Sequence, residues 1–411
     1  MAKRLLFVDD ETMVLGGLRR ALHGMRAEWD MHFVDGADAA LKILDEMPFD
    51  VVVSDMRMPK MDGAQLLEQV KLRHPDVIRM VLSGQSSRAA VLRSLAPAHQ
   101  FLSKPCDPQE LINRLAEAFA MRDLLSNEAL KTIVSRLRSV PSLPTIYDEL
   151  MSVLRKEDPP ISQIEKIIAK DVGMAAKILQ LANSAFIGAR GRVSSLLQAV
   201  SMIGTETVRT LVLSVHVFSH FDNNSEIAPF LPALWQHSVS TAALAQKIAT
   251  AQGAPKGVID ESFTGGLLHD IGKVVLLSEM PRQYRPILEK SSGEVSTLEL
   301  QQLGCTHAQV GAYLISIWGL PVPLVRAVAF HHSPTEAAEN SFSSLTAVHA
   351  ADAITSASDP SPRNHDGELD LKYLEHIGLS QRIDVWCTFP EAQKQAQAAR
   401  ASGDGENPVR R

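Results

Sequence analysis

The sequence predicts an α/β fold with a five-stranded parallel sheet in the first part of the chain and an all-α fold in the second part. From residue 1 to about 123, short β-rich runs alternate with helical stretches, which is typical of a sheet built from βα units. From Ile146 onward such runs nearly vanish and amphipathic stretches follow one another. The length of 411 residues exceeds the roughly 100–200 residues of one domain, so we expect more than one core.

Five short runs are the candidate strands of the sheet. They are Leu5–Val8, Met31–Val34, Val51–Ser54, Val77–Leu82 and Phe101–Leu102. The first, third and fourth are continuous apolar runs, as expected of parallel strands that helices cover on both faces. Five helices accompany the strands, and the last of them has a clear beginning, because Asp107 can cap it and Pro108 suits its first position.

Apolar residues at helical spacing predict the helices of the second part. Examples are Ile161–Ala169, Gly173–Ala182, Leu196–Ile203, Ser238–Ala251 and Gly265–Leu277. Four apolar residues ahead of them also follow helical spacing and predict a helical connector: Leu130, Ile133, Val134 and Leu137. This apolar stripe must be covered by the chain's own second domain, by a second copy of the chain in a homodimer, or by a partner.

These patterns divide the chain into four parts. They are a first domain over residues 1–123, the connector over residues 124–140, an all-α domain over residues 141–390, and a tail over residues 391–411. The tail has no large apolar anchor apart from Val409, so we expect it to be disordered.

Composition narrows the classes of partner. The 41 Lys and Arg residues against 47 Asp and Glu residues give a net charge of −6, which offers no basic surface for nucleic acid. Cys106, Cys305 and Cys387 are far apart, so we expect neither disulfides nor a zinc ribbon, and a reducing cytoplasm suits the chain. No apolar run approaches the roughly 20 residues that span a bilayer, so we expect no membrane partner.

Polar residues follow the ends of four predicted strands. Asp9 and Asp10 come after the first strand and Asp55 after the third, while Ser83 and Lys104 follow the fourth and fifth. In an open parallel sheet these carboxyl ends form the binding edge. Carboxylates gathered there would repel one another unless a hard cation joined them, and Mg²⁺ prefers such oxygen ligands. The sequence therefore predicts a Mg²⁺ site.

A carboxylate beside such a cation can attack a phosphoryl donor and become an aspartyl-phosphate. Lys104 would neutralise the phosphoryl oxygens and Ser83 would donate a hydrogen bond to them. In the alternative interpretation, Asp9 and Asp10 cap a helix, Asp55 is a solvated loop acid and Lys104 is a surface charge. That alternative requires that residues suited to phosphoryl chemistry follow all four strand ends by chance.

Residues 1–123 resemble a response-regulator receiver domain. The motifs are Phe7-Val8-Asp9-Asp10-Glu11, Val53-Ser54-Asp55-Met56-Arg57-Met58-Pro59, Met61-Asp62-Gly63, Ser83-Gly84 and Lys104-Pro105. The resemblance implies a flavodoxin-like doubly wound sheet, with Asp55 as phosphoacceptor and a sensor histidine kinase or phosphotransfer protein as donor. It implies Mg²⁺ held by Asp10, Asp55 and the backbone carbonyl of Arg57, with Asp9 nearby. It also implies that Ser83 and Phe101 form a conformational switch.

The second part contains seven residues with metal-ligand chemistry. They are His237, His269, Asp270, His307, His331, His332 and Asp352. Imidazole with carboxylate suits Fe, Mn, Zn or Ni better than Mg or Ca. The adjacent pair His269-Asp270 is the strongest signal, because its apolar neighbours predict a buried helix on which both groups are costly unless paired or metal-bound. Taken alone, His237 or His307 is more often an ordinary core histidine than a ligand.

Residues 135–355 resemble the HD superfamily of metal-dependent phosphohydrolases, and most closely its HDOD branch. The motifs include Val140-Pro141-Ser142-Leu143-Pro144, Asp171-Val172-Gly173, Ala182-Asn183-Ser184-Ala185-Phe186, Gly266-Leu267-Leu268-His269-Asp270-Ile271-Gly272-Lys273 and Trp318-Gly319-Leu320-Pro321. In catalytic relatives such a set of His and Asp residues holds one or more metals that activate water, and Lys273 is a candidate for catalytic support.

Two departures bear on catalysis. No Gly-Tyr-Pro element follows His331-His332, and Ala233 replaces an acid that some relatives place one turn before the first ligand. The HDOD branch is regarded as a signalling module without established catalysis. We therefore expect a phosphorylation-controlled response regulator whose second domain binds a downstream signalling protein. The alternative is a metal-dependent phosphohydrolase that acts on a nucleotide or a cyclic dinucleotide.

Overall fold

The computed structural model describes most of the chain in ordered segments. They comprise residues 2–83, 97–104, 107–124, 130, 133–134, 140–142, 144–154, 159–183, 193–205, 208, 218–220, 229–290, 295–358 and 368–389. The predicted tail lies outside the described residues, as does most of the predicted connector. Among the described residues, no helix combines the length and the apolar character needed to cross a membrane.

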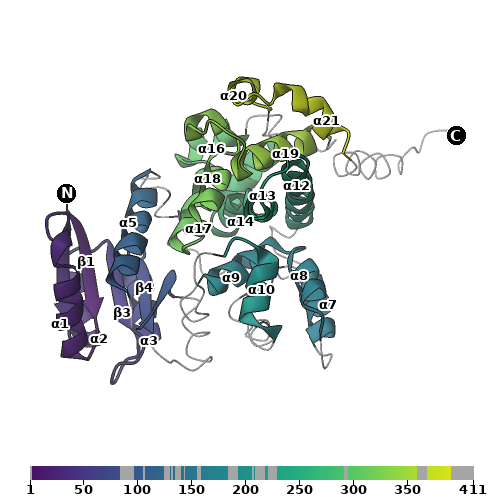
Figure 1. The fold of residues 1–411 in the computed structure, drawn as a ribbon. Coiled ribbons are helices and arrows are strands. Elements are labelled where there is room, and N and C mark those ends of the chain that lie inside the picture. The colour runs from purple at the N-terminus through teal and green to yellow at the C-terminus, as the bar shows by residue number, and fades with distance from the viewer. Residues whose placement is uncertain are drawn as a thin grey trace.

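The first part of the chain forms the predicted five-stranded sheet, in which all neighbouring strands are parallel (Figure 1). The strands are β1 (Lys3–Val8), β2 (Trp29–Val34), β3 (Val51–Asp55), β4 (Ile78–Ser83) and β5 (Gln100–Ser103). Their order in the sheet is β2-β1-β3-β4-β5, the flavodoxin-like order whose direction of winding reverses between β1 and β3. The α/β expectation is confirmed.

Four α-helices of this part lie among the described residues. They are α1 (Thr12–Ala21), α2 (Ala37–Glu46), α3 (Gly63–Arg73) and α5 (Pro108–Leu124). The α5 helix begins as predicted, because Asp107 Oδ1 accepts a hydrogen bond from the backbone N–H of Gln109 at 2.9 Å. Most of the segment between β4 and β5, where the remaining helix was expected, lies outside the described residues.

The second part is mostly helical, as predicted. Its helices are α7 (Pro144–Leu154), α8 (Ile161–Ile168), α9 (Val172–Ala182), α10 (Leu196–Ile203), α12 (Leu231–Ala251), α13 (Lys256–Leu268), α14 (Ile271–Glu279), α15 (Pro281–Lys290), α16 (Val295–Leu303), α17 (His307–Ile317), α18 (Val322–Phe330), α19 (Ser344–Ser358), α20 (Leu371–His376) and α21 (Ile383–Cys387). It also contains a short parallel pair of strands that we did not predict, β6 (Val140–Ser142) and β7 (Phe218–His220).

One helix prediction is wrong in an informative way. We expected a single helix over Gly265–Leu277, but α13 ends at Leu268 and α14 begins at Ile271. The backbone of Asp270 leaves the helical region, with φ −97° and ψ 11°. The apolar spacing continues through this break because both helices pack against the same core. Spacing alone therefore does not reveal the turn that contains His269 and Asp270.

The apolar stripe of the connector is buried within the single chain. Leu130, Ile133 and Val134 are at most 5% exposed and belong to the same hydrophobic cluster as the sheet and α9, while Leu137 lies outside the described residues. We considered three ways to cover this stripe. In this structure, the rest of the same chain covers Leu130, Ile133 and Val134.

Candidate functional sites

The first candidate site lies at the carboxyl edge of the sheet. Strands β1 and β3 are neighbours, with Val8 opposite Ser54, so Asp9 and Asp55 leave the sheet side by side. Asp9 is 1% exposed and Asp55 is 7% exposed. Two nearly buried carboxylates in this arrangement need a cation between them.

Lys104 supplies a positive charge to both carboxylates. Its Nζ lies 2.5 Å from Asp9 Oδ2 and also forms an ion pair with Asp55 Oδ1. Partial burial would lower the pKa of Lys104, but its hydrogen bonds to Asp55 and Asp9 outweigh that effect and raise the pKa. Lys104 is therefore a firmly charged ammonium group that faces the carboxylate edge.

The other predicted residues of this site lie around that group. Asp10 is exposed and directly follows Asp9. Asp55 Oδ2 accepts a hydrogen bond from the backbone N–H of Arg57 at 2.6 Å. Phe101 is 3% exposed in β5. Ser83 ends β4, but its side chain lies outside the described residues.

Gly63 shapes the loop that follows Asp55. A Cβ atom on Gly63 would lie 2.1 Å from the carbonyl oxygen of Asp55, so only glycine permits this approach. The sequence motif that contains Gly63 was part of the resemblance, and the structure provides the physical reason for glycine at that position.

The second candidate site gathers all seven predicted His and Asp residues from separate elements. His237 comes from α12, His269 and Asp270 from the turn before α14, and His307 from the first position of α17. His331 and His332 follow α18, and Asp352 lies in α19. We call these seven residues the histidine centre. Their ligand atoms form two groups, one of Asp270, His307, His331 and His332 and the other of His237, His269 and Asp352.

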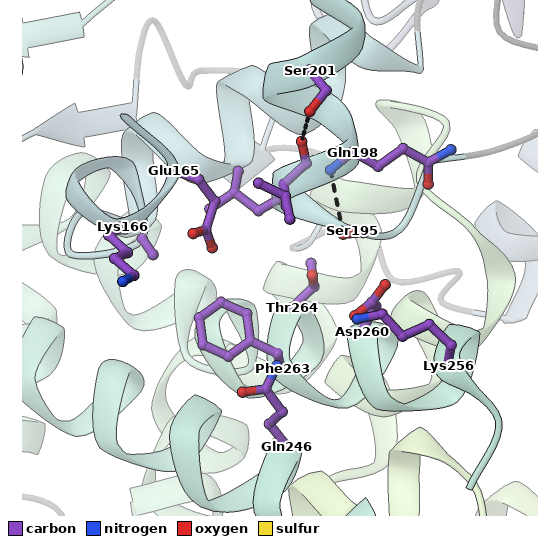
Figure 2. Close-up of a pocket in the computed structure, with 13 residues that line it drawn as sticks. Glu165, Lys166, Ser195, Gln198, Ser201, Gln246, Lys256, Asp260, Phe263 and Thr264 are labelled. Carbon is purple, nitrogen blue, oxygen red and sulfur yellow. Dashed lines mark hydrogen bonds and ion pairs between the residues drawn. The ribbon is translucent and has the colours of Figure 1, made fainter. Parts of the chain in front are cut away.

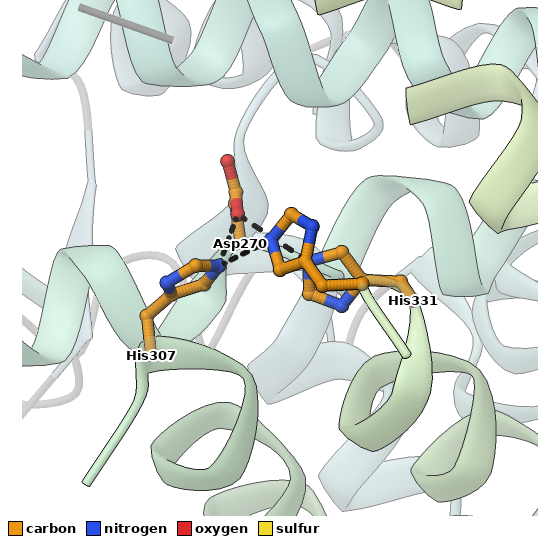
Figure 3. A group of neighbouring side chains, drawn as sticks. Asp270, His307 and His331 are labelled. Atoms are coloured by element: carbon orange, nitrogen blue, oxygen red, sulfur yellow. Dashed lines mark hydrogen bonds and ion pairs between the residues drawn. The ribbon is translucent and has the colours of Figure 1, made fainter. Parts of the chain in front are cut away.

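Short distances join the ligand atoms of the histidine centre. His237 Nε2 lies 2.9 Å from Asp352 Oδ1 and 3.2 Å from His269 Nε2. Asp270 stands between the two groups, because its Oδ2 is 3.5 Å from His269 Nε2 and its Oδ1 is 3.3 Å from His307 Nε2. Figure 3 shows Asp270, His307 and His331 directed toward one another. Ligands bonded to one ion at about 2.0–2.2 Å stand roughly 3–3.5 Å apart, so these spacings suit metal coordination.

Backbone carbonyls fix the orientation of two imidazole rings in the centre. Nδ1 of His269 donates to the carbonyl oxygen of Gly266 at 2.7 Å, and Nδ1 of His331 donates to that of Val328 at 2.8 Å. A carbonyl oxygen can only accept, so each Nδ1 carries a proton and Nε2 is the ring nitrogen that faces the centre. Such outer hydrogen bonds are typical of metal-binding histidines.

Burial and charge in the centre also suit a cation. The seven side chains are at most 3% exposed, except His332 at 15%. Asp270 Oδ1, Asp352 Oδ2 and His331 Nε2 have no hydrogen-bond partner among the described residues. Burial lowers the pKa of His331 to about 3, which keeps that ring neutral and its lone pair available. Unsatisfied buried atoms of these types are costly unless a cation binds them.

Lys273 is close to the centre. Its Nζ donates to Asp270 Oδ2 at 2.9 Å. Burial alone would raise the pKa of Asp270, but the charges of His269 and Lys273 hold it well below its ordinary value. Asp270 is therefore an ionised carboxylate.

Sequence reasoning missed Glu299, which contacts the centre from behind, and Tyr284, which donates a hydrogen bond to Glu299. Glu299 and Tyr284 are both fully buried, and Glu299 forms hydrogen bonds with His307. Glu299 stands between Leu298 and Leu300 in the sequence, and Leu300 is 55% exposed. No pattern of spacing therefore distinguishes Glu299 from an ordinary surface acid.

A cavity of about 740 Å³ opens between α8, α10 and α13 (Figure 2). Its walls include Glu165, Leu197, Asp260 and Phe263. No residue of the histidine centre lines it. This cavity and the histidine centre are therefore separate features of the helical part.

Comparisons with known proteins match two parts of the chain to family models. A model of the response regulator receiver domain matches residues 5–116, and a model of the HDOD domain matches residues 140–334. An uncharacterized protein from Treponema pallidum is 28% identical over 214 residues, which are 51% of this chain and 40% of that protein. The hydrogenase transcriptional regulatory protein HoxA from Cupriavidus necator is 33% identical over 122 residues, 29% of this chain and 25% of HoxA.

Solved structures include similar chains. The MmoQ response regulator from Methylococcus capsulatus is 24% identical, with a TM-score of 0.46, and the match covers 63% of this chain and 98% of that one. The chain spans less than half the length of the two relatives named above, with 40% and 25% covered.

The fold and the family models together define the class of protein. The first part is a receiver domain and the helical part is an HDOD domain. The chain is a response regulator with an HD-type output domain.

Proposed function

We propose that phosphorylation of Asp55 controls this response regulator. A phosphohistidine on a sensor histidine kinase or phosphotransfer protein is the proposed donor. A carboxylate oxygen of Asp55 forms the new bond to phosphorus as the P–N bond breaks, and the imidazole of the donor retains the electron pair. The ion pair of Lys104 with Asp55 supports this proposal, because it places a positive charge where the phosphoryl oxygens would stand.

The carboxylate edge also fits Mg²⁺. Asp10, Asp55 and the backbone carbonyl of Arg57 would hold the ion, with Asp9 beside them. A bound Mg²⁺ would neutralise negative charge on the phosphoryl oxygens. The nearly complete burial of Asp9 and Asp55 supports this assignment, because two such carboxylates repel each other without cations.

We propose further that the HDOD domain acts by binding a downstream signalling protein, and that its histidine centre is a buried metal site with a structural role. One observation carries this proposal: apart from His332 at 15%, the ligand side chains are at most 3% exposed. A hydrolase must admit both water and a phosphate ester to its metal. Imidazole and carboxylate donors suit Fe, Mn, Zn or Ni in such a site.

A second candidate function is metal-dependent hydrolysis of a phosphate ester. The observation that favours it is the assembly of all seven ligand candidates with Lys273, whose Nζ is 2.9 Å from Asp270 Oδ2. A metal bound there would lower the pKa of a coordinated water. Lys273 would then keep Asp270 ionised and oriented.

Metal analysis with the variant His269→Ala, Asp270→Ala tests the metal site that both functions require. We expect wild-type protein purified without chelators to contain a transition metal and the double variant to lose most of it, since removal of ligands weakens a site strongly. His376→Ala, which changes an exposed histidine of the same domain, should retain the metal.

Hydrolysis assays complete the test. Cyclic dinucleotides and nucleotide phosphates should be stable with both wild-type protein and the double variant. Hydrolysis by wild-type protein that is absent from the double variant would establish the phosphohydrolase instead. Wild-type protein without metal would contradict both assignments of the histidine centre.

A further inference from the structure

Glu299 is a buried carboxylate that faces the histidine centre from outside the ligand set. It lies in α16 with 0% exposure, and its own helix contributes Val295 and Leu303 to the hydrophobic cluster around it. A buried carboxylate is costly unless hydrogen bonds compensate it fully. The partners of Glu299 therefore indicate what the group does.

Among the described residues, Tyr284 and His307 donate hydrogen bonds to Glu299. The hydroxyl of Tyr284 donates to Oε1 at 2.6 Å. The backbone N–H of His307 donates to Oε2 at 2.7 Å, and the ring Nδ1 of His307 lies 2.8 Å from the same oxygen and 3.0 Å from Oε1. Glu299 thus holds His307 at two points, one on the backbone and one on the ring.

This double contact fixes the tautomer of His307. An ionised carboxylate can only accept, so Nδ1 of His307 carries a proton and Nε2 is the ring nitrogen left to bind a metal. That Nε2 points into the centre, 3.3 Å from Asp270 Oδ1 and 3.0 Å from His332 Nε2. The arrangement is that of a metal-binding histidine with a carboxylate behind it.

Glu299 differs in charge from the groups behind the neighbouring rings. His269 and His331 donate to neutral backbone carbonyls, whereas His307 donates to a carboxylate. His307 is also the first residue of α17, where the positive end of the helix dipole would make the ring a poorer electron donor. A full negative charge at Glu299 opposes that effect.

We propose that Glu299 is a positioning residue for the metal of the histidine centre, acting through His307 by fixing its tautomer and strengthening its Nε2 as a ligand. This inference rests on the proposed metal site. The metal that His307 would bind with the help of Glu299 is a divalent transition metal. Tyr284 orients Glu299 through the hydrogen bond of its hydroxyl.

The variant Glu299→Gln tests the proposal. Glutamine has the same size and can still accept from Tyr284, but it is neutral and weakens the contact with Nδ1 of His307. We expect the affinity for Zn²⁺, measured by competition with a chromophoric chelator, to fall about 10- to 100-fold. The helix content and the melting temperature of the metal-free protein should change little. Tyr284→Phe retains the contact between Glu299 and His307, so its Zn²⁺ affinity should stay within about threefold of wild type.

A measurement on the wild-type protein guards against a variant that fails to fold. Long-range ¹⁵N NMR of the imidazoles, assigned with His307→Gln, should show His307 of the metal-free protein protonated at Nδ1. An Nε2-protonated tautomer would overturn the proposal, as would a Glu299→Gln variant that binds Zn²⁺ as tightly as wild type. If the wild-type protein itself binds no Zn²⁺, the metal site fails and the role of Glu299 fails with it.

Discussion

Lys104 is the residue on which the charge balance of the receiver site depends. It contacts both Asp9 and Asp55, each nearly buried. Phosphorylation of Asp55 would replace one negative charge by about two at neutral pH. The same ammonium group would then face more negative charge, so we expect its ion pairs to rearrange when Asp55 is modified.

We predict that Asp55 is the only phosphoacceptor. Asp55→Asn should reduce labelling by a small phosphodonor in the presence of Mg²⁺ to background, because an amide cannot form the acyl phosphate. Quantification of incorporated phosphate after gel electrophoresis measures the effect. Asp35→Asn is a matched control, since Asp35 also follows a strand of the sheet but is exposed. Labelling of Asp55→Asn at the wild-type yield would refute the assignment.

The residues of the two candidate sites differ in how far the sequence could predict their positions. The ends of parallel strands meet at one edge whatever the loops do, so Asp9, Asp55 and Lys104 could be placed together from strand positions alone. The seven residues of the histidine centre could be selected by their metal-ligand chemistry, and the family resemblance implied that they act as a set. Glu299 could not be predicted, because its contact with His307 depends on how α16 packs behind α17.

The break between α13 and α14 is the element that makes the histidine centre possible. Adjacent side chains on a continuous helix point about 100° apart, so His269 and Asp270 could not both face one site from a regular helix. The turn between α13 and α14 brings His269 Nε2 within 3.5 Å of Asp270 Oδ2. Apolar spacing predicted one continuous helix here, because the turn depends on tertiary contacts that spacing does not reveal.

Gly272 allows α14 to approach α17 closely just after this turn. A Cβ atom on Gly272 would lie 1.9 Å from the carbonyl oxygen of His307 and 2.8 Å from the backbone nitrogen of Gly311. Both obstacles are backbone atoms, which cannot rotate away. We therefore predict that Gly272→Ala lowers the free energy of unfolding by about 1–3 kcal/mol or more. Chemical denaturation followed by circular dichroism measures the change.

A second glycine provides the control for this element. Gly257 lies in α13 and is exposed, and a Cβ atom on it would meet no other part of the protein within 4 Å. Gly257→Ala should leave stability unchanged or raise it by up to about 1 kcal/mol, since alanine favours helix. Equal stability of Gly272→Ala and Gly257→Ala would show that the two helices can separate without cost.

At the scale of the whole molecule, the receiver and the HDOD domain contact each other directly. Helix α5 packs against α17, and the two parts lie next to each other in Figure 1. Gln180 Nε2 of α9 donates to the carbonyl oxygens of Ala98 and His99 at 3.5 and 3.4 Å. These two hydrogen bonds join polar groups, so neither apolar spacing nor motifs in the sequence predicted them.

Lys177 reinforces the HDOD side of this contact. Its Nζ donates to Gln180 Oε1 at 3.1 Å and lies 4.7 Å from the centre of the Trp318 ring. Burial, with a smaller effect of Lys71, lowers the pKa of Lys177 to about 7. Lys177 and Gln180 therefore belong to one hydrogen-bond network, and Gln180 extends this network to the receiver domain.

Strand β5 joins the phosphorylation site to this contact. Gln100 packs against Gly319, where a Cβ atom would lie 3.2 Å from the Gln100 side chain. The next residue is Phe101, the predicted switch, and Lys104 follows the end of the same strand. We therefore expect a shift of Lys104 or Phe101 to displace the Gln100 side chain. Tightly packed interfaces deform little and rearrange between discrete states instead.

We predict that occupation of Asp55 loosens this contact without any chemistry in the histidine centre. Beryllofluoride, which imitates the phosphoryl group, should speed amide hydrogen exchange in α5 and α9, and it should do so equally in the variant His269→Ala, Asp270→Ala. The connector over residues 124–140 should respond as well, since its stripe at Leu130, Ile133 and Val134 is buried in the same cluster. Gln180→Ala should show the faster exchange before treatment, and Asp55→Asn should show no response. If exchange is unchanged and only a hydrolytic rate responds to beryllofluoride, the output of this protein is catalytic and the interaction role is wrong.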